Sequence, residues 1–226
     1  NTQNMVGPAP ELPVILGTPV PVTNNTDLET KGFELEVGWR DRTSNGVGYG
    51  ARFLLSDSRT RITRYSNPSN SLSRYRAGQE MGEIWGYTTK GIAHTKQEMD
   101  DHLATLPNGG QNALGGYWEA GDIMYEDVNG DGKIDWGEST ANNSGDLRII
   151  GNSLPRYSFG ADLTADWKGI DVRLFFQGVL KRDIFQSSFY FWGINGEQGP
   201  WFSSIFEEHM DYFRDDPNHV LGQNLD

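Results

Sequence analysis

The chain has 226 residues, no cysteine, and a formal net charge of −12 from 19 basic and 31 acidic residues. The excess of acid argues against a nucleic-acid partner, because phosphate contacts need a basic surface. The lack of cysteine excludes disulfide scaffolds and zinc–thiolate sites. No stretch approaches the roughly 18–20 apolar residues that a transmembrane helix requires. The first residues carry no signal-peptide pattern, and the last are polar, so we expect a piece of a longer protein.

The first third of the chain predicts a loop followed by a hairpin. Residues 1–29 hold five of the ten prolines and show no periodicity, which indicates an extended loop. From residue 30 apolar and polar residues alternate, and a second alternating run follows the turn-rich segment 41–46. Because a two-residue period is typical of a half-buried strand, we expect a hairpin over residues 30–57.

The middle of the sequence predicts a long connection, and a second hairpin follows it. Residues 58–154 are rich in turn residues, with one short helix expected over Thr95–Leu106, where Thr95 caps and Glu98 completes a capping box. Alternation returns over residues 155–180 around a tight Lys168–Gly169 turn, which indicates the clearest hairpin in the chain. We expect residues 181–226 to be a strand end and another long loop.

The predicted strands are long, and their connections are alternately short and very long. Strands of about 10–12 residues exceed the soluble average and suit a transmembrane barrel, which has short periplasmic turns and long extracellular loops. The predicted fold is therefore all-β, a fragment of a large transmembrane antiparallel β-barrel. A soluble β-sandwich with one wet face would produce the same alternation.

In the barrel interpretation the apolar phase of the strands faces lipid, and the charged phase faces the lumen. The residues predicted to face lipid are Phe33, Leu35, Val37, Phe53, Phe159, Leu163, Val172 and Leu174. Trp39, Tyr49 and Trp167 lie near the short turns on the same phase, where they would form an aromatic girdle at the membrane boundary.

One acidic segment has the pattern of a calcium-binding loop. Residues 127–138 match D-x-[DN]-x-[DN]-G-x5-E at every specified position. Calcium takes six to eight oxygen ligands, which such a loop offers at alternate positions. The predicted metal ligands are Asp127, Asn129, Asp131, the backbone carbonyl of Lys133, Asp135 and Glu138.

The flanks of this segment weaken an EF-hand interpretation. Residues 121–126 read as strand rather than helix, and residues 139–145 as turn, so we expect a solitary loop whose ion is calcium, with magnesium as the alternative. An ion-free acidic turn is the competing interpretation. The sequence contains no nucleophile motif, acid/base pair, phosphate-binding loop or cofactor motif, so we do not expect an enzyme.

Four stretches of the sequence resemble one family. They are TKGFE at 30–34, GEIWGY at 82–87, AGDIMYEDVNGDGKID at 120–135, and the long run 149–183. Together they resemble the C-terminal part of a SusC/RagA-type TonB-linked outer-membrane protein, over about residues 30–56, 78–91 and 120–183. Residues 1–29 and 190–226 add little to the resemblance.

The resemblance implies a 22-stranded barrel of the bacterial outer membrane that is closed by a plug. Such proteins import glycans or peptides with energy from TonB, and a SusD-like surface lipoprotein caps the barrel. This chain contains neither the plug nor the TonB-contacting segment, so the resemblance implies a part of one barrel domain. The alternative function is a secreted, calcium-stabilised β-sandwich that binds carbohydrate.

Overall fold

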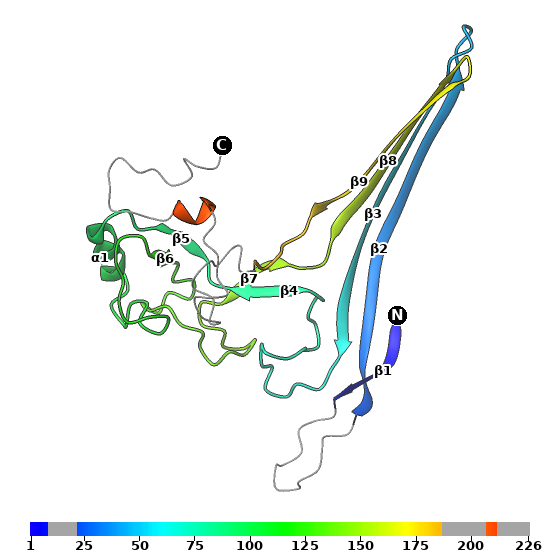
Figure 1. The fold of residues 1–226 in the computed structure, drawn as a ribbon. Helices are drawn as coiled ribbons and strands as arrows, with labels where there is room; N and C mark the ends of the chain where they lie inside the picture. The colour runs from blue at the N-terminus through cyan, green and yellow to red at the C-terminus, as the bar shows by residue number, and fades with distance from the viewer. Residues whose placement is uncertain (9–21, 187–206, 212–226) are drawn as a thin grey trace, which may run out of the picture. The chain divides into compact units, whose positions relative to one another are not determined.

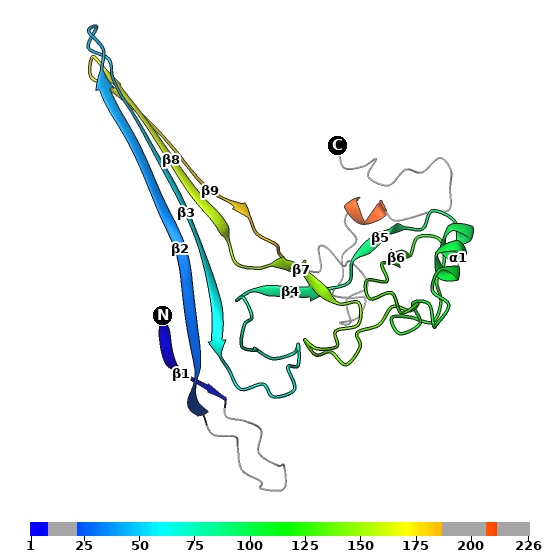
Figure 2. The same cartoon turned by 180° about the vertical axis from the view of Figure 1, so that it is seen from behind.

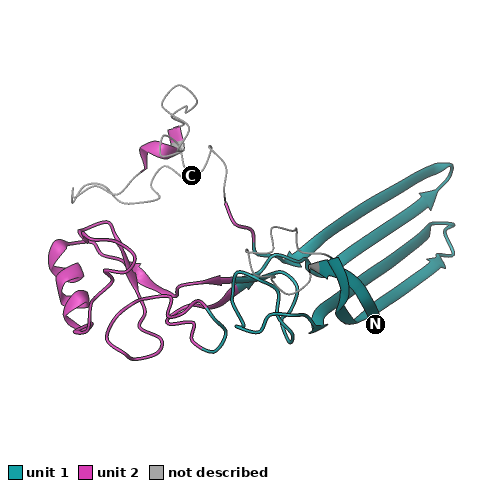
Figure 3. Cartoon of the chain, turned by 90° about the horizontal axis from the view of Figure 1, so that it is seen from below, with its two compact units in different colours: residues 1–84, 140–142, 151–183 teal, residues 85–139, 143–150, 184–226 magenta. Residues whose placement is uncertain are grey.

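The computed structural model describes residues 1–8, 22–186 and 207–211. The chain divides into two compact units, which Figure 3 colours separately. Unit 1 comprises residues 1–84, 140–142 and 151–183, and unit 2 comprises residues 85–139, 143–150 and 184–226. In the described ranges no helix combines the length and the apolar character needed to cross a bilayer.

Unit 1 is built on one antiparallel sheet of five strands in the order β1-β2-β3-β8-β9 (Figures 1 and 2). The strands are β1 Thr2–Pro8, β2 Val22–Arg42, β3 Gly48–Arg64, β8 Arg156–Trp167 and β9 Ile170–Lys181. β2 and β3 form the hairpin expected over residues 30–57, and β8 and β9 form the one expected over residues 155–180. The all-β expectation is confirmed.

The two short turns lie at the same end of the sheet, because Gly48 of β3 stands opposite Asp166 of β8. In the β8–β9 turn Lys168 and Gly169 both have positive φ, 46° and 85°. This is the type I′ pattern, whose twist matches that of the two strands. The β2–β3 turn is closed by the Val47 carbonyl, which accepts a bond of 2.8 Å from the Thr43 amide.

The loop expected over residues 1–29 is wrong in part. It contains β1 and the first residues of β2, which pair from Thr2 opposite Leu28 to Pro8 opposite Val22. Residues 22–29 are mostly polar, so alternation did not reveal them. They are held instead by cross-strand hydrogen bonds and by Asp27, which forms a bidentate ion pair with Arg64 of β3 at 2.7 and 2.8 Å.

The connection between β3 and β8 contains short elements, as expected. They are β4 Glu83–Gly86, β5 Thr89–Ile92, α1 Lys96–Ala104, β6 Ile123–Tyr125 and β7 Arg148–Asn152. β4 pairs with β7, and β5 pairs antiparallel with β6. The only element described after β9 is the short 3-10 helix Glu207–Met210. The rest of the loop expected over residues 181–226 lies largely outside the described residues.

Helix α1 begins where the sequence predicts. The Thr95 hydroxyl accepts a hydrogen bond from the Glu98 amide at 3.1 Å, as an N-cap should. The Glu98 carboxylate accepts from the His94 amide at 2.8 Å, one residue before the position of an ideal capping box. The helix ends at Ala104, two residues earlier than expected, because Thr105 already bonds back to His102.

Among the described residues of unit 2 only a few apolar side chains are buried, and a polar network is buried as well. Ala93, Met99, Leu106 and Ile134 are at most 3% exposed. Gln111 is fully buried; its side-chain oxygen lies 3.0 Å from a ring nitrogen of His102 and accepts from the Tyr125 amide, and its nitrogen donates to the Ile123 carbonyl. This glutamine therefore ties α1 to β6.

Candidate functional site

The register of unit 1 places the apolar phase of four strands on one face, which we call the apolar face. Across β2, β3, β8 and β9 one row runs Val37, Phe53, Ala161, Phe176, and the next runs Trp39, Ala51, Leu163, Leu174. The eight residues predicted to share a face do so. Seven of the eight side chains are exposed, among them Val37 at 57% and Leu174 at 51%. This exposure differs from that of a β-sandwich, in which a second sheet covers the apolar face.

Phe159 is the half-buried member of the apolar face. Gly178 stands opposite it in β9. A Cβ atom on that glycine would lie 2.8 Å from Cε1 of the phenylalanine ring, which is closer than real Cβ contacts. The glycine therefore provides the space over which the ring lies, a known way of covering a strand glycine with an aromatic side chain.

The opposite face carries ion pairs between strands, and we call it the polar face. Arg52 of β3 binds Glu36 of β2 with two bonds of 2.7 and 2.9 Å. Arg173 of β9 binds Asp162 of β8 with bonds of 2.8 and 2.6 Å. Bidentate pairs of this kind fix geometry as well as charge, so the polar face is a hydrophilic wall in which most charges are already matched.

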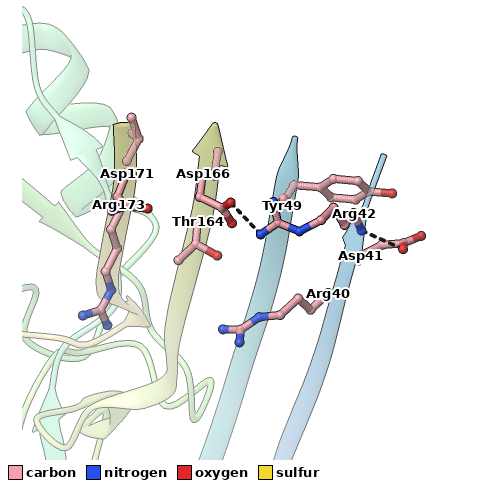
Figure 4. A pocket seen from close by; sticks show the side chains of 11 residues that line it. Arg40, Asp41, Arg42, Tyr49, Thr164, Asp166, Asp171 and Arg173 are labelled. Carbon is pink, nitrogen blue, oxygen red and sulfur yellow. Dashed lines mark hydrogen bonds and ion pairs between the residues drawn. The ribbon is translucent and has the colours of Figure 1, made fainter. Parts of the chain in front are cut away.

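A third pair on the polar face crosses an intervening strand. Arg42 of β2 reaches Asp166 of β8 at 2.6 Å, although β3 lies between these two strands (Figure 4). Gly48 of β3 makes this contact sterically accessible, because a Cβ atom there would lie 2.1 Å from the Asp166 carboxylate. The pair borders a hollow of about 590 Å³ at the turn end of the sheet, also lined by Arg40, which makes no ion pair within the described ranges.

The aromatic residues near the short turns lie on the apolar face, as predicted. Trp39 and Trp167 are 67% and 46% exposed, and Tyr49 is 42% exposed. The ammonium group of Lys168 lies 4.7 Å from the centre of the Trp167 ring, a cation–π contact at the tip of the hairpin. This end of the sheet therefore presents amphipathic side chains to one side.

The acidic loop 127–138 belongs to unit 2 and is folded around Asp127. The carboxylate of Asp127 accepts from the amides of Gly130 at 2.7 Å, Asp131 at 3.2 Å and Gly132 at 2.8 Å. Gly130 and Gly132 have φ of 77° and 82°, which glycine adopts without strain. Ile134, near the end of the loop, is buried.

The predicted ligands of this loop are only partly brought together. The carboxylate of Asp135 forms an ion pair with the Lys133 ammonium, and this hydrogen bond lowers the pKa of Asp135 and raises that of Lys133. Glu138 is exposed. In the described part of the chain no group of three acidic or histidine side chains converges as a metal site would.

Sequence reasoning missed one residue of this site. Asp146 is fully buried, and its carboxylate accepts from the amides of Val128, Asn129 and Asp135. It lies outside the calcium motif, in the segment interpreted from sequence only as following a turn. Its one signal was the Gly145–Asp146 pair, a turn-like dipeptide shortly before β7.

Comparison with known proteins gives two curated relatives. The TonB-dependent receptor P3 of Formosa agariphila is 26% identical over 196 residues, which is 81% of this chain and 18% of that protein. The TonB-dependent receptor P26 of the same organism is 21% identical over 72% of this chain. The chain thus spans less than a fifth of the length of the curated relatives it matches.

No protein-family model matches the sequence. Among solved structures, the chain is similar to one described as the structure of the RagAB peptide transporter, with a TM-score of 0.49 and 18% identity over 77% of this chain and 17% of that chain. The curated matches confirm the resemblance to TonB-dependent outer-membrane proteins that the sequence shows, and the location that this resemblance gives is the bacterial outer membrane.

Proposed function

We propose that this chain forms part of the wall of an outer-membrane importer for a nutrient, with its apolar face against lipid and its polar face toward the lumen. The observation that carries the proposal is the register, which gathers exposed apolar residues of four long strands on one face and ion pairs on the other. A barrel has this alternation, because lipid contacts one face and water the other.

The polar face suits a path for a hydrophilic solute. The pairs Arg52–Glu36 and Arg173–Asp162 match their charges within the wall, so these four charged groups are not free to hold a solute in transit. We propose an oligosaccharide or a peptide as the substrate. TonB acts on a part of the protein outside this chain, and a SusD-like lipoprotein is the proposed partner at the extracellular end.

We propose that the loop Asp127–Glu138 binds calcium and thereby stabilises the extracellular side. The motif and the folded turn at residues 130–132 support this. Binding would require Asp135 to leave the Lys133 ammonium and Glu138 to turn inward. Oxygen ligands at about 2.3–2.6 Å would identify calcium, and octahedral geometry at about 2.0–2.1 Å would identify magnesium.

The proposed role of this chain is binding and passage rather than catalysis. The sequence carries no nucleophile, acid/base pair or cofactor motif of the kinds that reactions require. The test is incubation of the purified complete receptor with an oligosaccharide or peptide. Turnover that disappears when a single carboxylate of this chain is changed would contradict the proposal.

The membrane arrangement is tested with single cysteines: the 226 residues contain none, and any cysteine elsewhere in the complete receptor is first replaced with serine. Cysteine at Leu163 and, as the matched control, at Thr164 is introduced into the complete receptor in outer membranes. A water-soluble maleimide is expected to label residue 164, which faces the aqueous lumen, and not residue 163, which faces lipid. A lipid-soluble quencher is expected to reach a probe at 163 only. Equal labelling by the soluble reagent would overturn the assignment.

A further inference from the structure

The acidic loop 127–138 has a second organising carboxylate, which lies outside its calcium motif. We infer that Asp146 is the positioning residue that holds this loop in its folded form without any bound ion. The inference concerns the fold of the loop. It predicts that the loop is ordered without calcium, whereas the proposed calcium site predicts a response when calcium is added.

The contacts of Asp146 join the two ends of the loop. One carboxylate oxygen accepts from the amide of Val128 at 2.9 Å and from that of Asn129 at 3.4 Å, near the start of the loop. The other oxygen accepts from the amide of Asp135 at 2.9 Å. The amide of Asp146 in turn donates to the Asp135 carbonyl at 2.9 Å. The residue is therefore bonded twice to Asp135 and also to the opposite end of the loop.

Two carboxylates hold different parts of the loop. Asp127 accepts from the amides of residues 130–132 at the tip, and Asp146 accepts from the amides at both ends. Backbone amides carry partial positive charge, and they point at the carboxylates that accept their hydrogen bonds. The amides therefore offset much of the repulsion within the acidic loop, so a cation is not required for its order.

Two glycines bring Asp146 into this position. Gly145 has φ of 54°, and a Cβ atom there would lie 2.3 Å from the Asp135 carbonyl and 2.5 Å from the Gly137 amide nitrogen. A Cβ atom on Gly137 would lie 2.6 Å from the Gly145 nitrogen. The backbone segments thus approach more closely than other residues allow, and Asp146 becomes completely buried beneath the loop.

The contacts of Asp146 are those of a positioning residue. Both of its oxygens are directed to backbone amides, and its side chain is inaccessible. Glu138, the last residue of the calcium motif, is exposed and makes a contrasting control. Removing the carboxylate of Asp146 should loosen the loop whether or not calcium is present, whereas removing that of Glu138 should alter only a response to calcium.

The test uses the complete receptor in detergent with a calcium chelator present, and measures amide hydrogen exchange at Val128, Asn129 and Asp135. In the wild type these amides are expected to be protected without calcium. In Asp146→Asn one acceptor becomes an amide donor, so exchange at one end of the loop is expected to be faster by about tenfold or more. Exchange in β8 and β9 is expected to stay unchanged, and Glu138→Gln is expected to match the wild type.

Two results would overturn the inference. One is a wild-type loop that is unprotected in chelator and becomes protected only when calcium is added, which would make the ion the organiser; this measurement needs no variant that might misfold. The other is unchanged exchange in Asp146→Asn. A lack of any calcium response in wild type and Glu138→Gln would refute the proposed calcium site while leaving the role of Asp146 intact.

Discussion

Replacing Leu163 with arginine tests the apolar face near the bilayer midplane, where a charge facing lipid costs most. Leu163 lies four residues before Trp167 in β8. At about 3.4 Å per residue this is about 14 Å along the strand, and a tilt of about 40° reduces it to about 10 Å along the membrane normal. Since the apolar band of such barrels is about 25 Å tall, Leu163 lies close to the bilayer midplane when Trp167 is at its boundary.

At that depth an outward arginine is expected to cost about 2–4 kcal/mol, which lowers the folded-to-unfolded ratio by roughly 30- to 900-fold. Thr164 is the matched control on the polar face. Arginine there stands opposite Arg173, and like charges in a cross-strand pair cost up to about 1 kcal/mol. The predicted difference between the two variants is therefore more than about 1 kcal/mol.

The measurement is the folded fraction of the complete receptor in lipid vesicles across a denaturant series, read from the shifted gel mobility of the folded barrel. Leu163→Phe should fold like the wild type, which shows that the site tolerates a change of shape. If Leu163→Arg and Thr164→Arg lose stability equally, or if the polar-face variant loses more, the lipid-facing assignment is wrong.

Three further perturbations follow from close contacts. Gly178→Ala should destabilise by about 1–3 kcal/mol, because its Cβ would meet the Phe159 ring, and Phe159→Leu should remove most of that penalty in a double-mutant cycle of thermal unfolding. Lys133→Met should tighten calcium binding about two- to fivefold in calorimetry, because the ammonium no longer competes for Asp135; no change would show that the ion does not use this carboxylate. The ion pair with Lys133 lowers the pKa of Asp135, so this carboxylate stabilises the loop above the usual carboxyl range and loses that effect as pH falls through the lowered pKa. Without the ammonium group the pKa of Asp135 rises, and Lys133→Met should therefore lose loop protection at a higher pH. Gln111→Ala should speed amide exchange in β6 by tenfold or more, because two part-buried backbone groups, the Ile123 carbonyl and the Tyr125 amide, lose their partner; slow exchange there would mean that the glutamine is dispensable.

The sequence predicts the strands in which apolar and polar side chains alternate. It does not predict a strand that is formed only by backbone pairing with its neighbour. Val37 and Leu163 fall on the apolar phase in sequence and on the apolar face in the structure. Residues 22–29 offered no such pattern, because their strand is stabilised by backbone bonds to β1 and by Asp27 with Arg64. Apolar and polar residues alternate only where the two faces of a strand contact different surroundings. A polar extension of a strand contacts water on both faces, so its sequence does not alternate.

The sequence predicts the turn within the acidic loop. It does not predict the contacts that the loop makes with the segment that follows it. The spacing from Asp127 to Gly132 specifies the tip, because the carboxylate and the amides it binds are neighbours in the chain. Asp146 meets Asp135 only because the glycines at 137 and 145 allow their backbones to touch. No local pattern encodes such a contact between segments that are apart in sequence.

The long connection between β3 and β8 begins and ends on two strands that are hydrogen-bonded neighbours. The pairing of β3 with β8 ends at Ser56 and Ser158, which stand opposite each other, so the sheet brings together the two points beyond which the chain leaves this pairing. The closure entropy of a loop grows only slowly with its length, by about 0.6 kcal/mol for each doubling. The inserted segment can therefore be lengthened, shortened or exchanged with little effect on the register beneath it. This segment can therefore vary between related proteins, or be replaced by design, while the strand pairing of the sheet stays the same.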